Sequence, residues 1–178
     1  MIVLSGPSAS GKTEVAKLLA KKYSIVKVIT TTTRPMRVNE VNGRDYFFVS
    51  EEEFLKMEKD NRFVETTLYN GYYYGSTKDQ IADNKCIVVD PIGLAKYIEL
   101  GNERIITFFL ESNEETRHKR MLERGDDPQI AIKRIEHDRK AFKNDSLPKV
   151  NYHIESETSD VETVCDKIYS LYYINKRK

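Results

Sequence analysis

The stretch GPSASGKT, residues 6–13, constrains the fold of this chain more than any other part of its sequence. It has the spacing G-x-x-x-x-G-K-[ST], in which the glycines let the backbone curl so that successive N–H groups point toward phosphate oxygens. The apolar run IVLSG leads into it, and the stretch GKTEVAKLLAKKY, with apolar residues on one helical face, runs out of it. A buried strand, a glycine-containing loop and a helix in this order predict a binding site for a nucleoside triphosphate.

The residues of this loop have predicted places in the phosphate-donor site. The ammonium group of Lys12 is expected to reach the β- and γ-phosphates, and the hydroxyl of Thr13 is a candidate ligand of Mg²⁺. A chance match within a glycine-containing turn is the alternative interpretation, and the flanking strand and helix argue against it. The predicted donor-binding residues of the loop are Gly6, Pro7, Ser8, Ala9, Ser10, Gly11, Lys12 and Thr13.

Strand-like and helical stretches alternate along most of the chain. SIVKVITTT is rich in β-branched residues, and KCIVVDPIG and RIITFFLES are apolar runs typical of strands buried in a parallel sheet. NEETRHKRMLERG and PQIAIKRIEHDRKAF are helical but highly charged, and they suggest an exposed lid. The closing helix SDVETVCDKIYSLYYI is expected to be capped by Ser159 with Glu162. Strands that alternate with helices favour a three-layer α/β fold around a parallel sheet.

A small β-rich lobe is predicted between two α/β stretches. RDYFFV is strand-like, SEEEFLKMEKD has a capping box at Ser50 and Glu53, and FVETTLYNGYYYGS predicts a hairpin around Asn70-Gly71. No internal repeat or long linker interrupts the chain, so we expect one domain. We assign residues 1–33 and 77–178 to its core, residues 34–76 to the lobe, and about residues 117–145 to the lid.

The charge balance and the cysteine content limit the partners and the compartment. The 29 Lys and Arg residues nearly balance the 28 Asp and Glu residues, and a formal net charge of +1 gives no bulk field that would attract nucleic acid or an anionic membrane. Cys86 and Cys165 have no disulfide or metal-binding spacing and are expected to be buried, reduced thiols. The N-terminal apolar run is too short for a signal peptide or a membrane span, so we expect a soluble cytoplasmic protein, either a monomer or a homodimer.

Phosphate-binding loops occur in several classes of protein, of which a small kinase fits best. A GTPase would be expected to carry the guanine-reading N-K-x-D, which this chain lacks, and motor ATPases usually need a longer chain. Phosphoryl transfer between two nucleotides needs a triphosphate cradle, an acceptor site and cations around the migrating group. Arg34 and Arg37 suit paired bonds to an acceptor phosphate, with Tyr46 and Tyr74 as further donors. The charged lid supplies further cations, namely Arg120, Arg124 and Arg134.

These residues resemble the guanylate kinase family, the ATP:GMP phosphotransferases. The family pattern is a loop of the type G-P-S-x-x-G-K-[ST], then [ST]-x-T-T-R-x-x-R-x-x-E-x-x-G-x-D-Y-x-F-V, F-x-E, G-x-Y-Y-G-[ST] and an apolar strand that ends in D-x-D. This chain has GPSASGKT, TTTTRPMRVNEVNGRDYFFV, FVE, GYYYGST and CIVVD in that order. The first half matches almost without gaps, and beyond about residue 100 the match thins to the arginine pattern of the lid and the order of strands and helices.

The resemblance implies a P-loop nucleoside monophosphate kinase fold and transfer of the γ-phosphate of MgATP to GMP, with dGMP as a second acceptor. It implies that the Glu65 carboxylate accepts from the guanine N1–H and 2-amino group, and that Thr30 and Ser76 contact the base. The implied acceptor-binding residues are Thr30, Arg34, Arg37, Tyr46, Glu65, Tyr74, Gly75, Ser76 and Asp90. The implied catalytic cations are Lys12, Arg37, Arg124 and Arg134, and Arg120 and Ser156 join the loop in the donor site.

Three positions depart from the family pattern. Val88 replaces the first acid of D-x-D, which leaves Asp90 alone; Ser156 stands where the family has an adenine-contacting Asn; and Thr30 replaces the more usual Ser. Two other functions remain as alternatives at this point. One is a catalytically weak guanylate-kinase-like module that binds protein partners, and the other is a kinase for a different nucleoside monophosphate.

Overall fold

The structure is a computed structural model that describes residues 1–143 and 147–176, so residues 144 and 145 of the predicted lid lie outside the described part. Its core is a five-stranded sheet with the order β2-β7-β1-β8-β9, in which every neighbouring pair is parallel. The predicted parallel sheet is therefore confirmed. Its strands are β1 (Ile2–Ser5), β2 (Val26–Lys27), β7 (Lys85–Val88), β8 (Ile106–Glu111) and β9 (Tyr152–Glu155).

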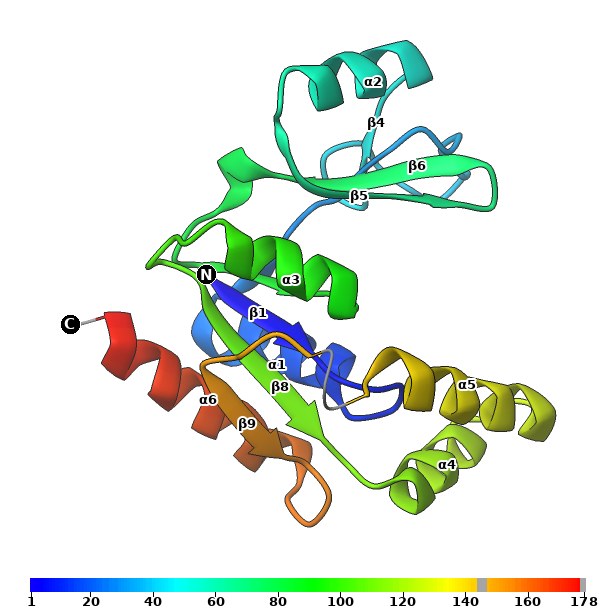
Figure 1. Ribbon diagram of the computed structural model, residues 1–178, viewed down its shortest axis with the longest axis vertical. Coiled ribbons are helices and arrows are strands. Elements are labelled where there is room, and N and C mark those ends of the chain that lie inside the picture. The colour runs from blue at the N-terminus through cyan, green and yellow to red at the C-terminus, as the bar shows by residue number, and fades with distance from the viewer. Residues whose placement is uncertain (144–146, 177–178) are drawn as a thin grey trace.

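Helices cover both faces of this sheet and make three layers (Figure 1). The alternation of side chains along β1 shows the arrangement, because Ile2 and Leu4 pack with α1 and α6, whereas Val3 packs with α3. Burial on both faces explains why these strands are apolar throughout rather than alternating with polar residues. The covering helices are α1 (Lys12–Tyr23), α3 (Pro91–Glu99) and α6 (Val161–Lys176).

A second sheet forms the lobe, which stands apart from the core in Figure 1. Its strand order is β4-β3-β6-β5, and helix α2 (Glu51–Lys59) covers it. Phe54 of α2 stacks on Phe63 at a centroid distance of 4.4 Å and on Tyr73 at 5.4 Å, which gives the lobe a small core of its own. The strands are β3 (Thr31–Thr32), β4 (Phe47–Phe48), β5 (Phe63–Tyr69) and β6 (Tyr72–Thr77).

The local signals in the lobe are largely confirmed. Asn70 and Gly71, with φ of 50° and 78°, join β5 to β6 in the predicted hairpin. The Ser50 side chain accepts from the N–H of Glu53 at 3.1 Å and so caps α2. The strand predicted for SIVKVITTT is wrong in extent, because β2 pairs in the core and β3 pairs in the lobe. The chain crosses between the two sheets at this point, so the second sheet begins at Thr31 rather than at residue 34.

The lid consists of α4 (Glu114–Glu123) and α5 (Pro128–Ala141). Met121, Ala131 and Ile135 pack between the two helices, with Ala9 of the phosphate loop against them. The cap predicted for the closing helix is wrong by one residue, because Asp160 rather than Ser159 accepts from the N–H of Thr163 at 2.8 Å. Within residues 1–143 and 147–176, no helix is long and apolar enough to cross a membrane.

Candidate active site

The phosphate loop lies directly on the neighbouring strand β8. Gly6 has φ of 141°, and a Cβ atom there would lie 2.4 Å from the carbonyl oxygen of Leu110, so a glycine is required for this close approach. Gly11, with φ of 94°, turns the chain into α1 without a side chain to cap the helix. The N–H groups of the first turn therefore face the loop with the positive end of the helix dipole, which suits a bound anion.

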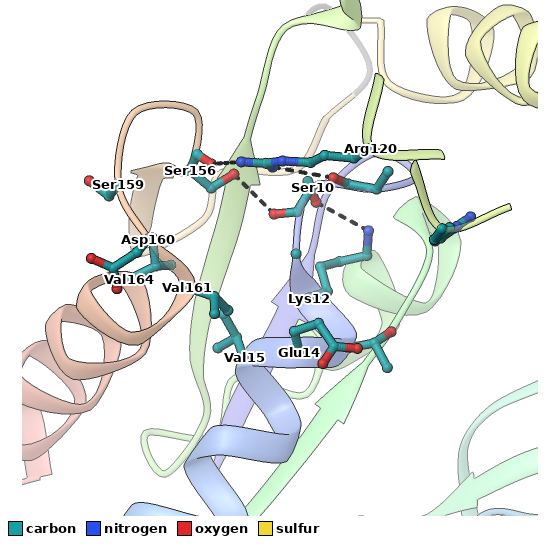
Figure 2. Close-up of a pocket in the computed structure, with 14 residues that line it drawn as sticks. Ser10, Lys12, Glu14, Val15, Arg120, Ser156, Ser159, Asp160, Val161 and Val164 are labelled. Atoms are coloured by element: carbon teal, nitrogen blue, oxygen red, sulfur yellow. Dashed lines mark hydrogen bonds between the residues drawn. The ribbon is translucent and has the colours of Figure 1, made fainter. Parts of the chain in front are cut away.

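The side chain of Lys12 is held at this loop by two earlier loop residues. Its Nζ donates to the carbonyl of Pro7 at 2.6 Å. It also donates to the hydroxyl of Ser10 at 3.3 Å, as Figure 2 shows. Burial lowers the pKa of the ammonium group to about 8, with Arg117 acting in the same direction and the nearby carboxylate of Asp138 opposing it. A partly desolvated cation at the loop is suited to binding and stabilising phosphate oxygens.

A pocket of about 500 Å³ opens at the loop, between the first turns of α1 and α6. Eight of the predicted donor-site and catalytic residues line it, namely Ala9, Ser10, Gly11, Lys12, Thr13, Arg120, Arg124 and Ser156. The three predicted residues at the start of the loop, Gly6, Pro7 and Ser8, are not among its lining residues. Sequence reasoning missed six lining residues, which are Glu14, Val15, Ser159, Asp160, Val161 and Val164. Most of these belong to α6 and the loop before it, far from the phosphate loop in sequence, and no local motif marks them.

Arg120 and Ser156 tie the lid and the sheet edge to the phosphate loop. The two η nitrogens of Arg120 donate to the carbonyl of Ala9 at 3.3 Å and to the carbonyl of Ser156 at 2.6 Å, so the guanidinium spans the pocket (Figure 2). The buried hydroxyl of Ser156 faces the carbonyls of Glu111 and Ser10 at 2.8 and 3.0 Å. Its position supports the loop from the side of β9.

The predicted catalytic arginines of the lid share one carboxylate, Asp126. Arg124 makes a bidentate pair with Asp126 at 2.9 and 2.6 Å, and Arg134 reaches the same carboxylate at 3.3 Å. The hydrogen bonds to Arg124 are the main cause of the lowered pKa of Asp126. Arg124 lines the pocket at the phosphate loop, and the shared carboxylate of Asp126 links Arg134 to Arg124. Asp126 was not predicted as a site residue.

A second pocket of about 510 Å³ lies between the lobe and α3, and Thr30, Glu65 and Asp90 are among its lining residues. Oε1 of Glu65 accepts from the N–H of Ser76 at 3.1 Å and from its hydroxyl at 2.6 Å. The hydroxyl of the buried Tyr97 donates to the Ser76 hydroxyl at 3.0 Å. Burial raises the pKa of Glu65, and the bonds from Ser76 partly offset that effect. No local pattern marks Tyr97, whose position on α3 is that of an ordinary core residue.

Asp90 lies where the strand β7 ends, beside the start of the phosphate loop. Its Oδ1 accepts from the N–H of Gly93 at 2.7 Å and caps α3. The hydroxyl of Ser5 donates to the carbonyl of Val89 at 3.1 Å and holds the two neighbouring strand ends together. Ligands of open α/β sheets bind at such carboxyl ends.

The residues present fit a magnesium ion bound mainly through a triphosphate. Thr13 lines the pocket at the loop, and Mg²⁺ commonly takes one or two protein oxygens together with water and phosphate oxygens. Within the described part of the chain, no group of three or more His, Cys, Asp and Glu side chains could hold a metal by itself.

Of the predicted acceptor-phosphate residues, Arg34, Tyr46 and Tyr74 lie together on the lobe, and Arg37 is joined to them through its backbone and Glu40. The Arg34 guanidinium lies 5.4 Å from the ring centroid of Tyr46, whose ring meets that of Tyr74 edge-on at 6.1 Å. Nη2 of Arg34 donates to Glu40 at 2.6 Å, and the backbone N–H of Arg37 donates to the same carboxylate at 2.9 Å. This cluster does not line either pocket described above. Glu40, which orders Arg34 and the backbone of Arg37, was missed as a site residue.

Gly75 follows Tyr74 and lies against Phe63 and the backbone of Glu65, where no side chain would fit without displacement. It therefore allows β6 to pass close to β5, the strand that carries Glu65.

A phosphate loop at the end of a central parallel strand, a second sheet outside the core and a pair of charged helices against the loop form the arrangement of a P-loop nucleoside monophosphate kinase. The guanylate kinase family model matches residues 1–171. Guanylate kinase from Anaplasma phagocytophilum is 34% identical, over 96% of this chain and 84% of that protein. Guanylate kinase from Caldanaerobacter subterraneus is 32% identical, over 99% and 87%. The crystal structure of the Anaplasma phagocytophilum guanylate kinase covers all of this chain and 86% of that chain with a TM-score of 0.64 and 26% identity. This chain belongs to the guanylate kinase family.

Proposed function

We propose that this protein is a phosphotransferase that moves the γ-phosphate of ATP to GMP, giving ADP and GDP, and that dGMP is a second acceptor. The observation that carries the choice of acceptor is the Glu65 carboxylate, which lines the pocket beneath the lobe with one oxygen fixed by Ser76. The second oxygen, which these bonds from Ser76 leave open, is suited to accept from the N1–H and 2-amino donors of guanine. Adenine offers no such donor pair, and a buried carboxylate left unpaired discriminates by ~10⁴ or more.

The donor side of the reaction rests on the loop and on the residues that hold it. The N–H groups of the first turn of α1 and the ammonium group of Lys12 bind the triphosphate, and Arg120 spans the pocket from the lid side. When bound with ATP, Mg²⁺ would neutralise charge on the phosphates, and the Thr13 hydroxyl would hold it.

The acceptor site must bind the phosphate of GMP as well as its base. We assign the phosphate to Arg34 and Arg37, with the hydroxyls of Tyr46 and Tyr74, because planar guanidinium groups suit bidentate phosphate capture. Thr30 lines the base pocket, and Ser76 lies behind Glu65.

The transfer itself requires positioning and charge stabilisation more than covalent chemistry. An oxygen of the GMP phosphate attacks the γ-phosphorus while the bond to the bridging oxygen of ADP breaks. Lys12, Arg37, Arg124 and Arg134 are the proposed cations around the migrating group, and closure of the lid would exclude water that could otherwise hydrolyse ATP. One chain supplies both pockets, which is compatible with a monomer or a homodimer. The free, buried thiols Cys86 and Cys165 fit a reducing compartment, and we place the reaction in the cytoplasm.

The test is a coupled assay of ADP release with GMP, dGMP, AMP, CMP, UMP and TMP as acceptors. We expect turnover with GMP and dGMP, and a fall of kcat/KM for GMP by about a hundredfold or more in Glu65→Ala. Glu52→Ala, which removes an exposed carboxylate on α2 of the same lobe, is the matched control and should retain wild-type kinetics. Equal activity with AMP and GMP in the wild-type protein would refute the proposed acceptor.

A further inference from the structure

A buried ion pair at the root of the lid contacts the phosphate loop directly. Arg117 of α4 and Asp138 of α5 are only 4% and 6% exposed, although the charged helices that carry them were expected to be solvated. Nη1 of Arg117 donates to Oδ2 of Asp138 at 2.8 Å. The pair therefore joins the two lid helices within the protein rather than at its surface.

Ser8 of the phosphate loop is held by this pair through three different groups. Its N–H donates to Oδ2 of Asp138 at 2.8 Å, and its hydroxyl donates to Oδ1 at 3.3 Å. Its carbonyl accepts from Nη1 of Arg117 at 3.4 Å. Nε of Arg117 also donates to the carbonyl of Ser112 at 3.1 Å, which fixes the guanidinium against the start of α4. The polar groups of one loop residue thus converge on one ion pair.

Stability does not account for a charged pair in this place. Buried ion pairs are often replaced by apolar residues of similar volume without loss of stability, and Met121, Ala131 and Ile135 already pack the same two helices together. A carboxylate beside a triphosphate site is also unfavourable for anion binding unless a cation neutralises it. What apolar residues could not supply is the set of hydrogen bonds to Ser8.

We propose that Arg117 and Asp138 are positioning residues, which hold the phosphate loop in the curvature that accepts a triphosphate and make the root of the lid move with the loop. This inference rests on the proposed use of the loop for ATP. Arg120 follows Arg117 by one helical turn on α4, and Arg134 precedes Asp138 by one turn on α5. The ion pair of Arg117 and Asp138 therefore sets the distance from which Arg120 and Arg134 approach the phosphates.

The test compares Arg117→Met, Asp138→Leu and the double variant with a control variant. The control removes a second ion pair, which joins the same two helices and whose partners are not residues of the loop. Arg139 of α5 and Glu114 of α4 form that control pair, which is exposed and joined at 2.7 Å. The measurements are thermal unfolding, the dissociation constant of ATP by calorimetry without any acceptor, and the KM values for ATP and GMP.

We expect the double variant to unfold within a few degrees of the wild type, with an ATP dissociation constant raised about tenfold and KM for GMP changed less than about twofold. Arg117→Met should bind ATP more weakly than the double variant, because it leaves an unpaired carboxylate beside the phosphates. Arg139→Ala with Glu114→Ala should leave ATP binding unchanged.

Wild-type ATP affinity in the double variant, or equal losses for ATP and GMP, would overturn the inference. If the double variant does not fold, Asp138→Asn serves instead, with ATP affinity expected to fall about threefold or more; unchanged affinity there would also overturn it. Because the titration uses ATP alone, failure of the protein to phosphorylate GMP would refute the proposed acceptor and leave this test intact.

Discussion

The hydroxyl of Ser76 donates to Oε1 of Glu65 over 2.6 Å, between residues that face each other on the adjacent strands β6 and β5. The Tyr97 hydroxyl donates in turn to Ser76 from the other side, so a carboxylate on the lobe is connected to a helix of the core. A carboxylate fixed in this way keeps its orientation without a ligand, which lowers the entropic cost of recognising a base.

Glu65→Gln is expected to lower kcat/KM for GMP by about a hundredfold, because the amide presents a donor toward the guanine donors. Since burial raises the pKa of Glu65 above its usual value, the carboxylate protonates at a higher pH than a free Glu side chain. The wild-type kcat/KM for GMP should therefore fall as pH decreases toward that raised pKa, and steady-state rates between pH 4 and 8 check this. An acid limb that persists unchanged in the glutamine variant would assign it to another group.

Tyr97→Phe removes only the hydroxyl that donates to Ser76. We expect KM for GMP to rise about three- to tenfold, because Ser76 and Glu65 lose a fixed orientation, while KM for ATP remains unchanged. Tyr172→Phe is the control, since it also deletes a largely buried hydroxyl but one that contacts the carbonyl of Asp83. Equal effects of the two variants on KM for GMP would mean that Tyr97 has a structural role only.

Lys12→Met is expected to abolish measurable transfer and to raise the free energy of unfolding at pH 7. The second effect follows because the folded state lowers the pKa of Lys12 from 10.5 to about 8, which means that burial disfavours the charged form present at that pH.

In the wild type, kcat/KM for ATP should decline as pH rises through about 8, because the free enzyme then loses the ammonium charge. Lys12→Arg keeps a cation at high pH and should lose this decline, whatever its residual rate. Chemical denaturation and pH–rate profiles check both statements; an identical alkaline limb in the arginine variant would contradict them.

Asp126→Asn is expected to tighten ATP binding about threefold at low salt, because the carboxylate no longer competes with phosphates for Arg124 and Arg134. Glu123→Gln removes an exposed carboxylate on α4 and is the control. Calorimetric titration measures the difference. Weaker binding in Asp126→Asn would show instead that Asp126 orients the arginines for the nucleotide.

Gly75→Ala is expected to destabilise the lobe by about 1–3 kcal/mol through overpacking. The new Cβ would lie 2.7 Å from Cδ1 of Phe63, whose ring is stacked on Phe54 and has little room to move. The loss should be smaller in a Phe63→Leu background, and thermal unfolding of the four proteins of this double-mutant cycle measures the coupling. If the losses in stability of the two single variants simply add, the contact with Phe63 is not the cause of the destabilisation by Gly75→Ala.

The local patterns of the sequence predicted a large part of the fold and of the site. The strand, loop and helix around residues 6–13, the hairpin at Asn70-Gly71 and the cap at Ser50 depend on neighbours within a few residues, so they can be read along the chain. The grouping of Arg34, Tyr46 and Tyr74 was predicted from the chemistry of these residues and agrees with the resemblance to a family, and the structure brings the three side chains together.

The contacts that complete the two pockets were decided by the tertiary structure. Val161 and Val164 reach the donor pocket because α6 packs beside α1, and Tyr97 reaches Ser76 because α3 lies under the lobe. Arg117 and Asp138 look like members of solvated helical faces in the sequence, yet packing of α4 and α5 against the phosphate loop buries them. Residues far apart in the chain acquire these partners through helix packing on the sheet, for which short-range periodicity carries no signal.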